Sequence, residues 1–150
     1  DGTGSNSNPS GLTYRGTSPF SEPETRSVGD YVKSLESNGS TILAAVDLHS
    51  YGQLIYRPYG WQRPSDGVPP NNDKIIEVCR SMEKAMECPN SKQYTDEPAA
   101  QYGAAPGAAD DWFTNRTLHK IGLTLELRPS SASVGFRLPP EDIVPAATEA

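Results

Sequence analysis

Apolar residues at helical spacing predict a first helix between residues 21 and 38. They form one stripe at positions i, i+3, i+4 and i+7: Val28, Tyr31, Val32 and Leu35. Ser21 followed three residues later by Glu24 has the form of a capping box, which predicts Ser21 as the N-cap. Gly39 supplies the left-handed residue that commonly ends a helix.

A second apolar stripe predicts a helix that is capped by Asn72 and ends before Pro89. Its members are Ile75, Cys79, Met82 and Met86. Cys79 lies on this stripe, so we expect a buried thiol. A disulfide to Cys88 would require the chain to fold back, because nine helical residues span ~13 Å and a disulfide tolerates less than ~7 Å between Cα atoms. A short third helix is predicted to start at residues 110–113.

Two stretches predict strands of different kinds. Residues 42–46 are a continuous apolar run, which is typical of a strand buried on both faces. Residues 121–127 alternate strictly, so four apolar side chains share one face while Thr124 and Glu126 share the other. A shorter apolar stretch follows at 53–56.

The remaining segments predict loops. Residues 1–19, 61–70 and 90–107 are rich in turn-forming residues and lack an apolar period. The Pro-rich tail from 138 to 150 is expected to end without a terminal helix. The polar first residues are typical of a loop rather than of a natural start.

Composition limits the function classes. A chain of 150 residues suits one domain with a core, and no stretch approaches the length of a membrane span. A net charge of −6 argues against nucleic acid as a partner. Two N-glycosylation acceptor patterns, at 38–40 and 115–117, are compatible with secretion, so we expect an extracellular protein.

The candidate chemistry lies on the two strands. Asp47 and His49 share one face near the end of the first strand, where α/β sheets usually bind ligands. His49 is either a structural histidine that is hydrogen-bonded to Asp47 or a metal ligand. Glu126 is either a general base beside a metal site or an ordinary strand carboxylate that is paired with Arg128.

Four pieces of the sequence occur in the order typical of one enzyme family. They are the loop and helix at 7–36, His-Ser-Tyr at 49–51, Tyr102 before Asp-Trp at 111–112, and Glu-Leu-Arg at 126–128. The chain resembles the zinc metallocarboxypeptidases of the carboxypeptidase A/B family over nearly its whole length. The resemblance implies an α/β fold with a mixed β-sheet flanked by helices. Residues 1–150 would form a partial catalytic domain, lacking its N-terminal half and the last helix.

The resemblance also implies roles for individual residues. His49 would be a zinc ligand, and Glu126 would activate the water that attacks the last peptide bond of a polypeptide. The family positions that contact substrate correspond to Ser50, Tyr51, Tyr102 and Phe136. Tyr102 would close over the terminal carboxylate, and Phe136 would line the outer subsites.

The resemblance implies that Asp110 determines which last residue of the substrate is preferred. The family residue just before Asp-Trp lies at the floor of the pocket for the last side chain, and an Asp there goes with Lys or Arg endings. The alternative is that Asp110 only charges the start of a helix, exposed to water. One extra residue between Tyr102 and Trp112 is a departure from the family pattern.

Part of the family site has no counterpart here. A catalytic zinc normally takes three protein ligands, yet the chain has two histidines, and neither His49 nor His119 begins a His-x-x-Glu motif. Asn115-Arg116 follows Trp112 and therefore does not correspond to the carboxylate-binding Asn-Arg pair. We therefore expect an exopeptidase acting on peptide and protein C-termini only together with the missing half. The alternative is a non-catalytic fragment or degenerate member that acts as a binding protein.

Overall fold

The computed structural model describes residues 4–86, 93–116 and 120–150. The helices in this part of the chain are α1 (Pro23–Ser37), α2 (Asn72–Ala85), α3 (Ala109–Asn115) and α4 (Ile143–Glu149). The strands are β1 (Ala44–Ser50), β2 (Leu54–Arg57), β3 (Thr95–Pro98) and β4 (Ile121–Leu127). Cys88, His119 and Thr117 lie outside the described residues.

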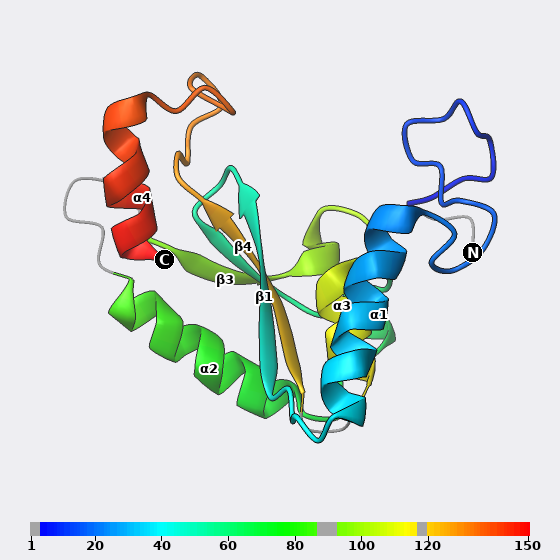
Figure 1. The fold of residues 1–150 in the computed structure, drawn as a ribbon. Helices are drawn as coiled ribbons and strands as arrows, with labels where there is room; N and C mark the ends of the chain where they lie inside the picture. The colour runs from blue at the N-terminus through cyan, green and yellow to red at the C-terminus, as the bar shows by residue number, and fades with distance from the viewer. Residues whose placement is uncertain (1–3, 87–92, 117–119) are drawn as a thin grey trace.

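The strands form one mixed sheet in the order β1-β4-β2-β3. β1 is parallel to β4, β2 is antiparallel to β4, and β3 is parallel to β2. Helix α2 covers one face of the sheet, whereas α1 and α3 lie on the other side (Figure 1). The expected α/β class, a mixed sheet flanked by helices, is confirmed.

The core lies between α2 and the sheet. It contains the expected stripe of α2 and the inward side chains of β2 and β4: Ile55, Ile75, Cys79, Met86, Tyr94, Leu123 and Leu125. The alternation expected for residues 121–127 is therefore confirmed. Cys79 is a free, buried cysteine, and burial raises the pKa of its thiol to about 12, so the thiol remains protonated at neutral pH.

Helix α1 differs from the expectation at its start. It begins at Pro23, with Glu22 as the N-cap, and the Ser21 hydroxyl donates to the Glu22 side chain over 2.9 Å. The capping-box prediction is wrong, because Pro lacks an N–H and suits the first helical turn. Gly39, with φ +87°, follows the helix as expected. Of the predicted stripe only Val32 is buried, and Tyr31 is 64% exposed.

Strand β1 is an edge strand, and this contradicts the prediction of burial on both faces. It pairs with β4 on one side and has no other partner among the described residues. Val46 is 45% exposed and Leu48 is 61% exposed. The core formed with α2 reaches the side chains of β4 and β2, and β1 lies beyond it.

Two further elements were not expected from the sequence. β3 lies within the segment that the sequence predicted to be irregular. Three of its four residues, Asp96, Glu97 and Pro98, are of types that are depleted in strands. It is held by parallel pairing with β2 and by Arg57, whose Nε donates to Asp96 over 2.7 Å. The Pro-rich tail forms the short helix α4, for which the sequence gave no signal. Arg128 binds Glu149 of α4 and, over 2.7 Å, Asp142 just before it.

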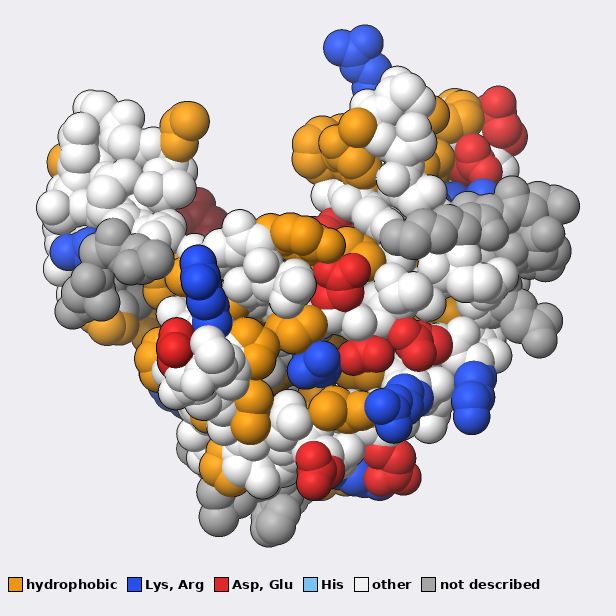
Figure 2. Space-filling model, turned by 180° about the vertical axis from the view of Figure 1, so that it is seen from behind, with side chains coloured by type: hydrophobic (Ala, Val, Ile, Leu, Met, Phe, Trp, Pro, Cys, Tyr) orange, Lys and Arg blue, Asp and Glu red, His pale blue; other side chains and the backbone are white. Residues whose placement is uncertain are grey.

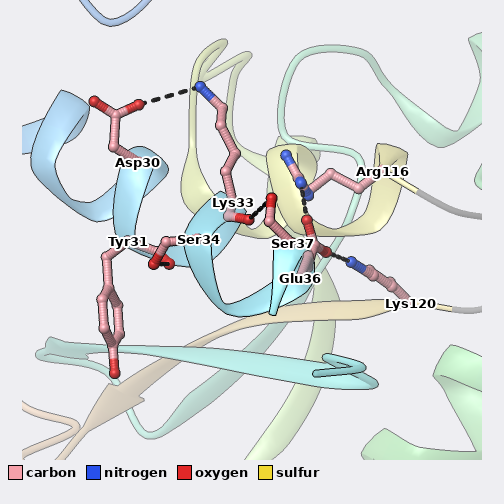
Figure 3. A network of polar contacts seen from close by, with 8 residues as sticks. All are labelled: Asp30, Tyr31, Lys33, Ser34, Glu36, Ser37, Arg116 and Lys120. Carbon is pink, nitrogen blue, oxygen red and sulfur yellow. Dashed lines mark hydrogen bonds and ion pairs between the residues drawn. The ribbon is translucent and has the colours of Figure 1, made fainter. Parts of the chain in front are cut away.

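Helices α1 and α3 are joined by a partly buried charge network (Figure 3). The Glu36 carboxylate of α1 accepts hydrogen bonds from Arg116, just after α3, and from Lys120, just before β4. These bonds lower the pKa of Glu36. Arg116 also stacks over the Trp112 ring, 4.6 Å from its centroid. The network fixes α3 against the sheet.

The surface seen from behind the view of Figure 1 is mixed. Acidic and basic side chains lie among apolar ones on this face, and the surface is hollowed between two protruding parts (Figure 2). No helix within the described residues has the length and apolar character needed to cross a membrane.

Candidate functional site

The register of two parallel strands brings His49 and Glu126 together. The residues are direct partners across β1 and β4, so their side chains leave the same face of the sheet. His49 Nδ1 lies 3.9 Å from Glu126 Oε1. Both positions fall at the carboxyl ends of their strands, which is the end where α/β sheets usually bind ligands.

The Glu126 carboxylate is set into the sheet. Its side chain is 17% exposed, and its Oε2 atom is buried without a hydrogen-bond partner in the described part of the chain. Burial raises the pKa of Glu126, and the nearby His49 offsets part of this rise. A carboxylate whose pKa is raised holds a proton more tightly than an exposed Glu, which favours a role in proton transfer.

The alternative pairing of Glu126 with Arg128 does not occur. The Arg128 guanidinium instead binds Asp142 and Glu149 near the C-terminal end of the chain. Glu126 is thus left for other contacts.

The expected contact between His49 and Asp47 is present. The two side chains share a face of β1, and His49 Nε2 lies 3.1 Å from Asp47 Oδ2. If Nε2 carries the proton of the neutral ring, it donates to Asp47 and leaves the Nδ1 lone pair toward Glu126. The structural and the metal-ligand hypotheses for His49 are therefore compatible, because metal-binding histidines commonly donate their other N–H to a carboxylate.

The donor set fits part of a zinc site. An imidazole nitrogen with a free lone pair is a preferred zinc ligand, and a carboxylate stands beside it. Among residues 4–86, 93–116 and 120–150, no group of three or more His, Cys, Asp and Glu side chains could hold a metal ion. The described residues supply one good ligand and a base, which fits a site completed by other ligands.

Asp110 is buried rather than exposed. It is 2% exposed, in the first turn of α3, and its Oδ1 accepts a hydrogen bond from the Asp111 N–H over 2.9 Å. Burial, together with the adjacent Asp111 charge, raises the pKa of Asp110 to about 6. The charge of Asp47 adds to this effect from β1. The alternative of a water-exposed charge at a helix start is wrong.

The close approach of α3 to β4 explains why Asp110 is buried. A Cβ atom added to Gly122 of β4 would lie 2.2 Å from the Asp110 backbone oxygen. Only glycine therefore allows α3 to pack this closely on the sheet.

Replacing Asp110 by Asn is expected to stabilise the chain at neutral pH. The folded chain binds the Asp110 proton more tightly than the unfolded chain, because the pKa rises from 3.8 to about 6. The free energy of unfolding therefore falls as pH rises through this range. Asp110→Asn removes this penalty, so we expect a gain of about 1–3 kcal/mol at pH 8 and almost none at pH 4.

Urea denaturation at the two pH values would measure this difference. The exposed Asp66 provides a matched control, because Asp66→Asn should change the free energy of unfolding little at either pH. An equal effect of Asp110→Asn at pH 4 and pH 8 would contradict the burial of a charged group.

Asp111 has a structural role that the sequence did not reveal. Its carboxylate accepts hydrogen bonds from the backbone N–H of Gly60, over 2.9 Å, and of Trp61, over 3.1 Å. Burial raises the pKa of Asp111, and these amides oppose the rise. Asp111 therefore fixes the loop after β2 against α3. The Asp-Trp pair was the available signal, but the two partners of Asp111 lie 51 and 50 residues earlier in the chain.

An aromatic pair stands beyond the end of β1. The rings of Tyr51 and Phe136 meet edge to face, with centroids 5.0 Å apart. Phe136 is 80% exposed, so the pair presents an apolar surface to solvent. Ser50 is the last residue of β1, and strand alternation puts its side chain on the face opposite His49.

Tyr102 lies beside a different strand. It follows a short 3₁₀ turn and is 77% exposed. A hydrogen bond to the Glu97 carboxylate of β3 raises the pKa of the Tyr102 hydroxyl. Tyr102 thus contacts β3 and not the His49–Glu126 pair.

Comparisons with known proteins agree on one family. The zinc carboxypeptidase family model matches residues 1–150. A metallocarboxypeptidase A-like protein of Trichophyton verrucosum is 33% identical over 99% of this chain and 35% of its own length. The inactive metallocarboxypeptidase ecm14 of Talaromyces stipitatus is 30% identical over 99% of this chain and 28% of its own length.

A solved structure is also similar. The crystal structure of thrombin activatable fibrinolysis inhibitor matches with a TM-score of 0.85 at 33% identity, over 99% of this chain and 35% of the other. The chain therefore spans about a third of the length of the proteins that it matches.

Proposed function

The chain belongs to the zinc carboxypeptidase family, and from this premise we propose that it forms part of the active site of a zinc-dependent exopeptidase. The complete domain hydrolyses the C-terminal peptide bond of polypeptides. The observation that carries the proposal is the pairing of His49 with Glu126 across β1 and β4, with Nδ1 and Oε1 3.9 Å apart.

Each residue of this pair has a distinct task. His49 would hold the metal through Nδ1, and the Glu126 carboxylate, whose Oε1 lies 3.9 Å from Nδ1, would accept the proton of the attacking water. A zinc ion held there supplies a positive charge that polarises the peptide carbonyl and acidifies the water. The raised pKa of Glu126 makes it a stronger base than an exposed carboxylate.

Asp110 selects Lys or Arg as the last residue of the substrate. Its carboxylate is buried, and no cationic side chain pairs with it in the described part of the chain. Burying an unpaired carboxylate is costly, so a substrate cation that reaches Asp110 recovers this cost. An apolar side chain would leave the carboxylate unpaired.

The exposed aromatic residues contact the rest of the peptide. Tyr51 and Phe136 form an apolar contact surface at the end of β1, and Tyr102 reaches the substrate from the β3 side. We also propose an extracellular location. Asn38 of one glycosylation acceptor pattern is exposed, as an N-glycosylated residue must be.

A second candidate is a non-catalytic member of the family. Two observations favour it: no group of three candidate ligands exists among the described residues, and one similar protein is named as inactive. Such a protein would keep the peptide-binding surface without hydrolysis. Metal binding by a complete domain that contains this chain distinguishes the two candidates.

The 150-residue chain is expected to bind zinc weakly through His49. One ligand in place of three should leave the dissociation constant above about one micromolar. Calorimetric titration with zinc measures it, with His49→Ala and His119→Ala as matched variants, since these are the two histidines of the chain. Binding should vanish in His49→Ala and survive in His119→Ala. Unchanged binding in His49→Ala would remove His49 from the metal site.

A further inference from the structure

We propose that Asp47 is a positioning residue that holds His49 in the tautomer able to bind metal. This inference rests on the proposed function of His49 as a metal ligand. Asp47 is two residues before His49 on β1, and its Oδ2 lies 3.1 Å from His49 Nε2. A neutral imidazole carries one N–H, so the nitrogen that donates determines which nitrogen keeps its lone pair.

His49 stands between two carboxylates. Asp47 is on the Nε2 side, and Glu126 is on the Nδ1 side, with Oε1 3.9 Å from Nδ1. The shorter contact to Asp47 places the proton on Nε2. Nδ1 then presents a lone pair on the side of the ring where Glu126 acts as base.

Loss of Asp47 would reverse this arrangement. Glu126 would become the carboxylate nearest to the ring and would attract the proton to Nδ1. That proton would block the lone pair needed for the metal and would engage the base in a hydrogen bond. Asp47 therefore keeps the ligand and the base apart, as carboxylates behind metal-binding histidines do.

A purely structural role does not account for Asp47. Its side chain is 45% exposed, and the contact to His49 is its one hydrogen bond in the described part of the chain. Asp110 adds a nearby negative charge rather than a partner. Substitution of Asp47 should therefore leave the core between α2 and the sheet intact.

Nitrogen NMR of the histidine rings tests the inference on the 150-residue chain without metal. At pH 8, above the ordinary histidine pKa of about 6.5, two-bond and three-bond ¹H–¹⁵N correlations distinguish the two tautomers. His119→Ala identifies the His49 signals. The parent chain should carry the His49 proton on Nε2, and Asp47→Ala should change the tautomer ratio toward Nδ1–H by about tenfold or more, as expected for one hydrogen bond to a charged group.

Two further variants distinguish a positioning role of Asp47 from a purely structural one. Asp47→Asn keeps an acceptor oxygen and should restore much of the Nε2–H form, whereas Glu126→Gln should leave the tautomer of the parent chain unchanged. A tautomer ratio in Asp47→Ala equal to that of the parent would overturn the inference. So would equal ratios in Asp47→Asn and Asp47→Ala.

Zinc added to the same parent sample distinguishes failure of the proposed function from failure of the positioning role of Asp47. Absence of any change at His49 Nδ1 at millimolar zinc would remove His49 as a ligand, whatever the tautomer result. A zinc-dependent change at Nδ1 that is weakened in Asp47→Ala supports both the proposed function and the positioning role.

Discussion

Glu126→Gln, in a complete domain that contains this chain, is expected to lower kcat by about 10²–10⁴-fold, the range of a lost general base. Gln preserves the shape of the side chain but cannot accept a proton from water. The buried Oε2 of Glu126 has no partner in the described part of the chain, so the substitution leaves no broken ion pair there. The loss should appear in kcat rather than in KM.

Steady-state kinetics with a short peptide and measurement of bound zinc would test this expectation together. Zinc content should stay at the parent level, because the proposed function gives Glu126 the role of base and not that of ligand. Glu141, which is exposed, provides the control: Glu141→Gln should retain normal kcat. Near-normal turnover in Glu126→Gln would exclude Glu126 from the chemistry.

Asp110→Ile is expected to reverse the preference for the last residue of the substrate. The parent should favour peptides ending in Arg over matched peptides ending in Phe by at least about 100-fold in kcat/KM, since an unpaired buried charge costs several kcal/mol. The raised pKa of Asp110, about 6, is the signature of a carboxylate that lacks such a partner. Ile removes the charge and leaves an apolar surface for Phe.

The ratio of kcat/KM for the two peptides is the measurement. Asp66→Ile on the exposed 3₁₀ turn serves as control and should leave the ratio unchanged. Parent enzyme that favours Phe, or an Asp110→Ile variant with the parent ratio, would show that Asp110 does not face the substrate.

The segments that the sequence predicted well have local signals that agree with their packing. The apolar side chains of α2 and those of β4 pack against each other in the core. Each apolar pattern in the sequence therefore corresponds to one buried surface. Gly39 ends α1 because a positive φ is a local requirement. These elements need no knowledge of distant residues.

The errors come from elements with distant partners. β3 has the sequence Thr-Asp-Glu-Pro and is held in place by pairing with β2 and by the Arg57–Asp96 ion pair. α4 forms where Arg128 binds Glu149 and Asp142, and the Pro-rich composition gave no sign of it. The apolar run at the start of β1 predicted full burial, but strand order puts β1 at the sheet edge.

In the candidate site, too, some features could be predicted from the sequence and others required the tertiary structure. The sequence by itself determined the chemical groups: one imidazole at the end of a strand, one carboxylate on an alternating strand, and an Asp before Asp-Trp. Only the tertiary structure decided that His49 and Glu126 are direct partners and that Asp110 is buried. Strand alternation is local and can be read along the chain, whereas register and helix docking depend on contacts between residues that are far apart in sequence.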